Sequence, residues 1–122
     1  MKTLPGKLRI EKESVATHIR YDCHGLVSQA ALVELIGTIR IESERGHTKI
    51  LIDLSRLEGD LTVMDRYILG TEVATNLMGK RIAVIAEKHK ITKVGENTAV
   101  NRGANMFVTH DEAEALAWLL KF

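Results

Sequence analysis

The chain has 122 residues, the length of one domain, and 45% of them are hydrophobic, which is enough to bury a core without disulfides or a metal. Its 17 lysines and arginines nearly balance its 16 aspartates and glutamates, so net charge does not support binding to nucleic acid or to an anionic membrane. Cys23 is the single cysteine, which excludes an internal disulfide and favours a reducing compartment.

Targeting segments are not evident in the sequence. The first residues lack the apolar stretch of a signal peptide, and no apolar run is long enough to span a bilayer. We therefore expect a cytoplasmic protein in which residues 1–122 form a single domain.

The first part of the chain predicts a β-hairpin. Residues 7–11 and 15–21 alternate between apolar and polar side chains, and the polar residues 11–14 separate them. The mixed polarity of both strands predicts that the hairpin forms an edge of the sheet. Residues 22–25 are predicted to be a turn, because they are polar and end in a glycine.

An amphipathic helix is predicted next. Ser28 is a suitable N-cap, and Gly46 is a suitable C-terminal stop. The apolar residues between them recur at helical spacing and are Leu32, Leu35, Ile36 and Ile39.

The centre of the chain predicts a buried strand followed by a loop and a second helix. Residues 50–54 are almost wholly apolar, as in a parallel strand covered on both faces. Residues 56–62 are predicted to be a loop, and a helix is predicted over 62–78, with Thr62 and Asp65 forming a capping box. Its predicted inner face carries Met64, Tyr67, Ile68, Leu77 and Met78.

The last third repeats the alternation of strand and helix. Residues 82–86 predict a second buried strand, residues 91–102 a weak helix and residues 106–108 a short strand. A capping box of Thr109 and Glu112 opens a final helix, whose predicted stripe is Ala113, Leu116, Ala117 and Leu120. This order predicts an α/β fold: a mixed sheet of about five strands with parallel central strands, and about four helices.

Several segments resemble STAS domains, the family of the bacterial anti-sigma factor antagonists. The resemblance covers nearly the whole chain and is carried by residues 10–15, 18–20, 25–26 and the strand 49–55. The tail, with Ala-Leu-Ala-Trp-Leu at 115–119, resembles a STAS-like branch that is mostly uncharacterised. The resemblance implies a SpoIIAA-like fold and a non-enzymatic binding or regulatory module.

One departure from the family pattern concerns phosphorylation. Partner-switching antagonists carry Asp-Ser-Ser-Gly at the start of the second helix, and a kinase phosphorylates the second serine. That motif falls on residues 61–64 here, where Val63 replaces the acceptor serine. The resemblance therefore implies partner binding without the usual phosphoserine switch, although Thr62 lies one residue away.

The expected working surface is the loop 56–62 with the start of the second helix, since ligands of open α/β sheets meet the carboxyl ends of the strands. The carboxylate of Asp53 and the hydroxyl of Ser55, at the end of a buried strand, are groups that bind a ligand or take part in chemistry. We favour the alternative that they hydrogen-bond loop amides and start a turn. The residues predicted to contact a protein partner are Asp53, Ser55, Arg56, Glu58, Asp60 and Thr62.

The resemblance also offers an alternative function, because some relatives of this fold hold apolar molecules between sheet and helices. The module would then carry or sense a small apolar ligand, although side chains at these spacings are more often plain core. The residues predicted to line such a cavity are Met64, Tyr67, Ile68, Met78 and Met106.

A homodimer through the last helix is a further expectation. The predicted contacts are Trp118, Leu119 and Phe122, which lie off the helix stripe and so add apolar area outside it. For Trp118 we give equal weight to the alternative that its ring covers the sheet of its own chain.

No catalytic constellation, metal motif or cofactor motif is evident in the sequence. It contains no glycine-rich phosphate loop and no nucleophile elbow. The five histidines lack ligand spacing, and we interpret them as single surface residues. The basic cluster at 88–93 is more often a solvated loop than an anion site. We therefore predict neither enzymatic activity nor a bound cofactor.

Overall fold

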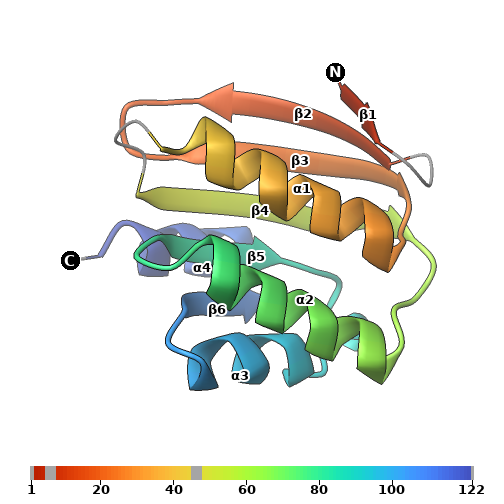
Figure 1. Ribbon diagram of the computed structural model, residues 1–122. Helices are drawn as coiled ribbons and strands as arrows, with labels where there is room; N and C mark the ends of the chain where they lie inside the picture. The colour runs from red at the N-terminus through yellow and green to blue at the C-terminus, as the bar shows by residue number, and fades with distance from the viewer. Residues whose placement is uncertain (1, 5–7, 45–47, 122) are drawn as a thin grey trace.

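The computed structural model describes residues 2–4, 8–44 and 48–121, and these residues form one mixed sheet flanked by helices (Figure 1). The strands are β1 (Lys2–Leu4), β2 (Leu8–Ser14), β3 (Ile19–Leu26), β4 (Lys49–Glu58), β5 (Arg81–Ile85) and β6 (Asn105–Thr109). The helices are α1 (Gln29–Glu42), α2 (Val63–Asn76), the short 3₁₀ helix η1 (Lys88–Lys90), α3 (Val94–Asn101) and α4 (Glu112–Leu119).

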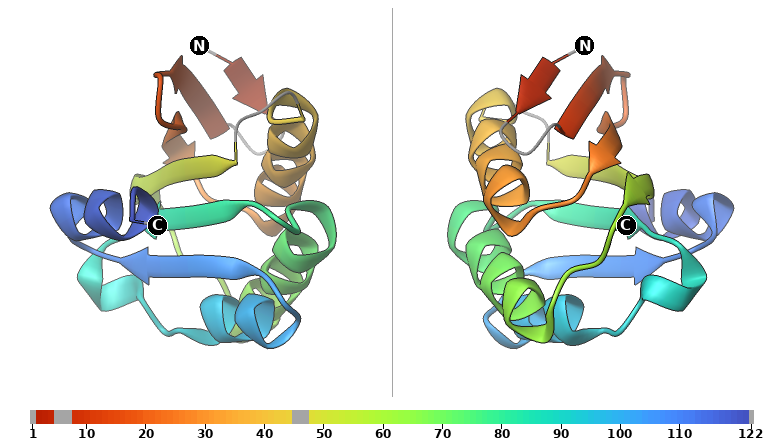
Figure 2. Two further views of the ribbon diagram at one scale, coloured as in Figure 1. Left: turned by 90° about the vertical axis from the view of Figure 1, so that its left-hand side faces the viewer. Right: turned by 90° about the vertical axis from the view of Figure 1, so that its right-hand side faces the viewer.

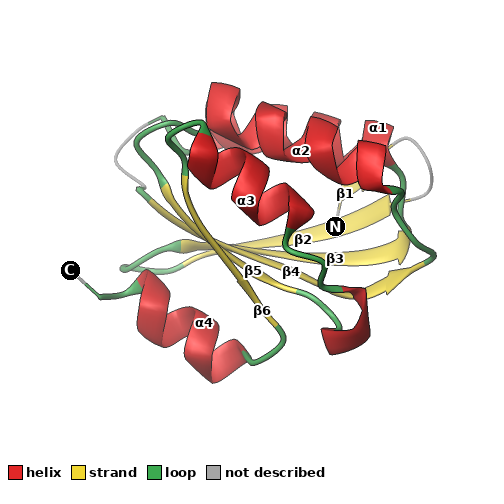
Figure 3. Ribbon diagram, turned by 90° about the horizontal axis from the view of Figure 1, so that it is seen from below, coloured by secondary structure: helices red, strands yellow, loops and turns green. Residues whose placement is uncertain are grey.

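The strands follow one another in the sheet in the order of the sequence. β1, β2 and β3 pair antiparallel, whereas β3, β4, β5 and β6 pair parallel. β4 and β5 are neighbours in the interior of the sheet, so the predicted parallel centre is confirmed. Helices α1, α2 and α3 cover one face, and α4 covers the other (Figures 2 and 3).

β4 and α1 form as their sequences predict. Ile50 and Leu51 are fully buried although they point to opposite faces, because helices cover the sheet on both sides. The predicted stripe of α1 is buried throughout, and Ser28 accepts a hydrogen bond from the Ala31 amide at 3.1 Å.

The first hairpin differs from its prediction. Residues 11–14 belong to β2, and residues 22–25 belong to β3, where we expected a turn. β3 continues because β2 pairs with one of its edges and β4 with the other, and these ladders satisfy the backbone. β1 then pairs with the outer edge of β2, so the hairpin itself is not the sheet edge.

β4 is also longer than predicted. The strand runs to Glu58, and Leu26 of β3 still pairs with that residue. Arg56 and Glu58 are therefore strand residues, and the loop before α2 shrinks to residues 59–62.

The inner face of α2 differs from the predicted one. Gly70, Val73 and Ala74 are the buried residues of the helix, and Leu77 follows them at its C-cap. Leu77 alone of the predicted inner face is buried, whereas Met64 and Met78 are exposed. Apolar residues occur all round this helix, so their spacing alone does not identify the side that meets the sheet.

The last helix begins two residues later than the predicted cap implies. Asp111 is the N-cap and accepts hydrogen bonds from the amides of Ala113 and Glu114 at 2.9 and 3.3 Å. Ala115 and Leu119 are its buried residues, so the predicted stripe is rotated away from the sheet.

Candidate functional site

An apolar pocket of about 140 Å³ lies between the sheet and helices α1, α2 and α3. Every one of these helices and the strands β4, β5 and β6 contribute to its wall. Aliphatic side chains dominate the lining and include Leu35, Ile52, Leu69, Val73, Val84 and Met106. The pocket extends to residues that follow β5, at the carboxyl end of the parallel strands, where open α/β sheets bind ligands.

The pocket has a different lining from the one the sequence predicts. Met106 alone of the five predicted residues lines it. Met64, Tyr67 and Met78 have 63%, 43% and 56% of their surface exposed, and Ile68 does not line the pocket. The rotation of α2 explains this error, because its true inner face carries Leu69 and Val73.

Two lysines of the predicted basic cluster fasten loops at the edge of the pocket. Lys90 Nζ donates to the carbonyls of Leu57 and Gly59 at 3.2 and 3.0 Å and so connects η1 to the end of β4 and to the loop before α2. Lys93 Nζ donates to the Val108 carbonyl at 2.7 Å and pairs with Glu96 at 3.0 Å. Lys88 and His89 lie exposed on η1.

The start of α2 is held by the predicted capping box. The Asp65 amide donates to Thr62 Oγ1 at 3.0 Å, and the Thr62 amide donates to Asp65 Oδ2 at 2.9 Å. The first two residues of the helix, Val63 and Met64, have 68% and 63% of their surface exposed. A rigid helix start therefore presents two apolar side chains to the solvent.

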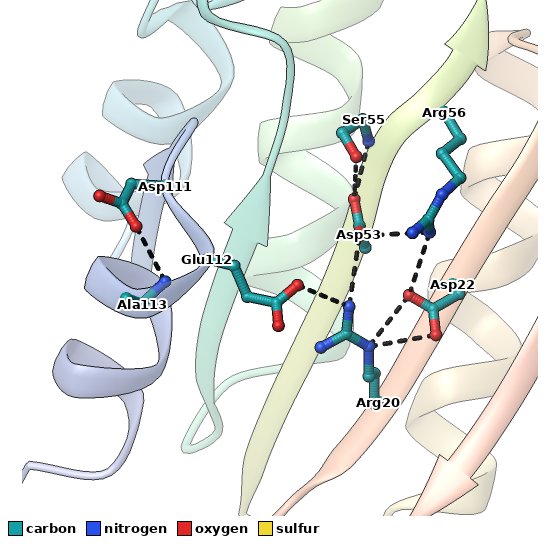
Figure 4. A network of polar contacts seen from close by, with 8 residues as sticks. All are labelled: Arg20, Asp22, Asp53, Ser55, Arg56, Asp111, Glu112 and Ala113. Atoms are coloured by element: carbon teal, nitrogen blue, oxygen red, sulfur yellow. Dashed lines mark hydrogen bonds and ion pairs between the residues drawn. The ribbon is translucent and has the colours of Figure 1, made fainter.

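Asp53 is buried in a polar network on the opposite face of the sheet (Figure 4). Its Oδ1 accepts from the amide and hydroxyl of Ser55 at 2.9 and 2.6 Å. Its Oδ2 accepts from Arg20 Nη2 at 3.3 Å and lies 3.5 Å from Arg56 Nη1. The turn-like bonding that we favoured for Asp53 and Ser55 is present, and the Asp53 carboxylate is fully engaged within the chain.

Arg20 is the centre of this network and connects three elements (Figure 4). Besides Asp53 of β4, it contacts Asp22 of β3 at 3.0 Å and Glu112 of α4 at 2.9 Å. The hydrogen bond to Glu112 and then that to Asp22 raise the pKa of Arg20, while its partial burial opposes the shift. The network attaches α4 to the sheet and leaves Asp53 no part in an exposed contact surface.

α4 buries one of the side chains that we expected at a dimer contact. Leu119 is fully buried against the sheet of its own chain. The prediction that Leu119 lies off the inner face of the helix is therefore wrong. The Trp118 ring packs 5.4 Å from Phe107 and 3.8 Å from the Arg81 guanidinium, as the intramolecular alternative expects. Phe122 lies outside the described residues.

The described part of the chain contains no cluster of metal-ligating side chains and no exposed thiol. No group of three or more His, Cys, Asp and Glu side chains there is placed to hold a metal ion. Cys23 is buried, and burial raises the pKa of its thiol to about 12, which keeps it protonated near neutral pH. None of the described helices is long and apolar enough to span a membrane.

Solved structures with the same architecture identify the fold. An anti-sigma factor antagonist from Mycobacterium paratuberculosis aligns with a TM-score of 0.66 and 17% identity, over 98% of this chain and 100% of that one. An uncharacterised DUF3478 protein from Shewanella loihica PV-4, described as having a SpoIIAA-like fold, aligns with a TM-score of 0.55 and 19% identity, over 98% of each chain. No family model and no curated protein match the chain. The agreement over nearly the whole length shows that the chain has the SpoIIAA-like α/β fold of STAS domains.

Proposed function

We propose that the protein is a non-enzymatic regulatory module that binds a protein partner through the loop 59–62 and the first turn of α2. The observation that carries this proposal is the exposure of Val63 and Met64 directly after the capping box. Exposed apolar side chains on a rigid element are typical of contact sites. We call Glu58, Asp60, Thr62, Val63 and Met64 the binding end of the molecule.

The charges beside Val63 and Met64 support the same surface. Glu58 and Asp60 are exposed, and their carboxylates form no hydrogen bond or ion pair with the described residues. An apolar centre flanked by available charges is the usual composition of a protein interface. One solved protein of the same fold is an anti-sigma factor antagonist, which is consistent with a regulatory role.

The proposal includes binding without a phosphoserine switch. Val63 occupies the position of the acceptor in the family motif and has no hydroxyl. The neighbouring Thr62 hydroxyl already accepts a hydrogen bond from the Asp65 amide. Phosphopeptide mapping of protein purified from its own cells tests this part, and substantial phosphate on Thr62 would contradict it.

A pair of matched variants tests the surface. Met64→Glu places a charge in the binding end, and Ile41→Glu places one at an equally exposed site on α1, since each side chain is 63% exposed. We expect affinity capture to recover the same partner with wild type and Ile41→Glu and to lose it with Met64→Glu. Equal recovery with all three proteins would place the interface elsewhere.

The pocket favours a second candidate function, the carriage or sensing of a small apolar ligand. Its volume is close to the roughly 150 Å³ of a known apolar cavity that binds benzene. Mass spectrometry of an organic extract of the purified protein tests this function. A stoichiometric small molecule is the expected result, and an extract without one, together with no binding of added apolar probes, would count against it.

A further inference from the structure

Arg66 has an unusual environment among the charged residues of the pocket. It belongs to the first turn of α2, lines the pocket and is partly buried. Its guanidinium forms no hydrogen bond or ion pair with the part of the chain that the structure describes. The guanidinium carries its charge at any physiological pH and offers five donors, so it favours an anionic partner.

The other charged side chains of the pocket already have partners. Lys90 donates to two backbone carbonyls and has the Glu87 carboxylate 3.9 Å away, and Lys93 and Glu96 pair with each other at 3.0 Å. Glu96 Oε1 also accepts from the Val108 amide at 2.9 Å. The charge available to a molecule in the pocket is therefore the positive charge of Arg66.

We propose that the pocket binds a small amphiphilic carboxylate, with its apolar body among the aliphatic side chains and its carboxylate on Arg66. This inference rests on the second candidate function and adds the chemical class of the ligand. A guanidinium holds a carboxylate through two parallel hydrogen bonds, and these are stronger than bonds between neutral groups. An alcohol or an amine of the same length lacks that interaction.

The size of the pocket limits the apolar body of the ligand. A cavity of about 140 Å³ accommodates a group near the size of benzene. Hexanoate is thus a suitable probe, and 1-hexanol and hexylamine are matched probes with a neutral and a cationic head. Calorimetry or NMR titration at neutral pH and constant ionic strength measures their affinities.

We expect hexanoate to bind about tenfold more tightly than 1-hexanol and hexylamine to bind most weakly, since a charge-assisted hydrogen bond contributes about this factor. Arg66→Met should remove the preference for hexanoate and leave 1-hexanol unchanged. Lys88→Met is the matched control, because Lys88 is exposed on η1 and does not line the pocket. It removes the same charge and should leave all three affinities as they are.

The outcomes separate this inference from the function on which it rests. Equal binding of hexanoate and 1-hexanol, or an unchanged preference in Arg66→Met, overturns the carboxylate assignment while the pocket remains a ligand site. Binding of none of the probes to the wild type contradicts both. Val73→Phe, which adds volume inside the pocket, should weaken hexanoate and 1-hexanol alike, and unaltered affinities in that folded variant would place the probes at another site.

Discussion

At the scale of single residues, Thr62 shows how a local sequence signal becomes a rigid feature of the molecular surface. Its hydroxyl and the Asp65 carboxylate each accept an amide hydrogen bond that the first turn of a helix cannot satisfy internally. Thr62→Ala should therefore lower the free energy of unfolding by about 0.5–2 kcal/mol. Thr62→Ser keeps the hydroxyl and should cost much less. Urea denaturation of the three proteins measures both effects, and equal losses for the two variants would show that the hydroxyl is not the stabilising group.

At the scale of elements, the contact between α2 and α3 depends on a glycine. A Cβ added to Gly70 would lie 2.5 Å from the Gly95 carbonyl oxygen and 2.8 Å from Thr98 Cβ, so the two helices would have to separate. Gly70→Ala should therefore destabilise the protein by about 1–3 kcal/mol despite the better helix propensity of alanine.

The matched control for this contact is Gly37→Ala in α1. A Cβ there meets no atom within 4 Å, so this variant should be neutral or more stable by up to about 1 kcal/mol. Thermal unfolding of both variants measures the difference. If Gly70→Ala melted at or above the temperature of Gly37→Ala, the close packing of the two helices would be contradicted.

At the scale of the whole molecule, the sheet separates two unequal cores. The larger core lies under α1, α2 and α3, and a smaller one joins Leu51, Ala83 and Ile85 to Ala115 and Leu119 of α4. The ends of α4 are held by arginines, since Arg20 pairs with Glu112 and Arg81 Nη2 donates to the Trp118 carbonyl at 2.6 Å. These contacts indicate that α4 is a stable part of the fold and contributes to its stability.

A pair of leucines tests this role of α4. Leu119→Ala removes a fully buried side chain and should lower the free energy of unfolding by about 2–5 kcal/mol. Leu120→Ala alters a neighbour that is 37% exposed and should cost clearly less. Chemical denaturation gives both values, and the reverse order would mean that the helix meets the sheet with the face predicted from the sequence.

The features predicted correctly from the sequence are those set by the pattern of apolar and polar residues within a short segment. The apolar run of β4 lies between polar segments, the apolar residues of α1 recur at helical spacing, and Thr62 with Asp65 forms a cap from neighbouring residues. The order of the helices and strands from β2 to α4 was also predicted, apart from η1, whereas β1 was missed. These features depend on residues that are close together in the chain.

The side of α2 and of α4 that faces inward could not be predicted from the sequence and is set by tertiary packing. Both helices carry apolar residues on several sides, so the inner face is selected by packing, through Gly70 against α3 and through Leu119 against β4 and β5. The extension of β3 through residues 22–25 likewise depends on pairing with β2 and β4. Arg66 was not predicted to be a site residue, because a single arginine in a helix carries no local signal. Its charge, which has no partner among the described residues, comes to lie beside an apolar pocket only when α2 packs on the sheet.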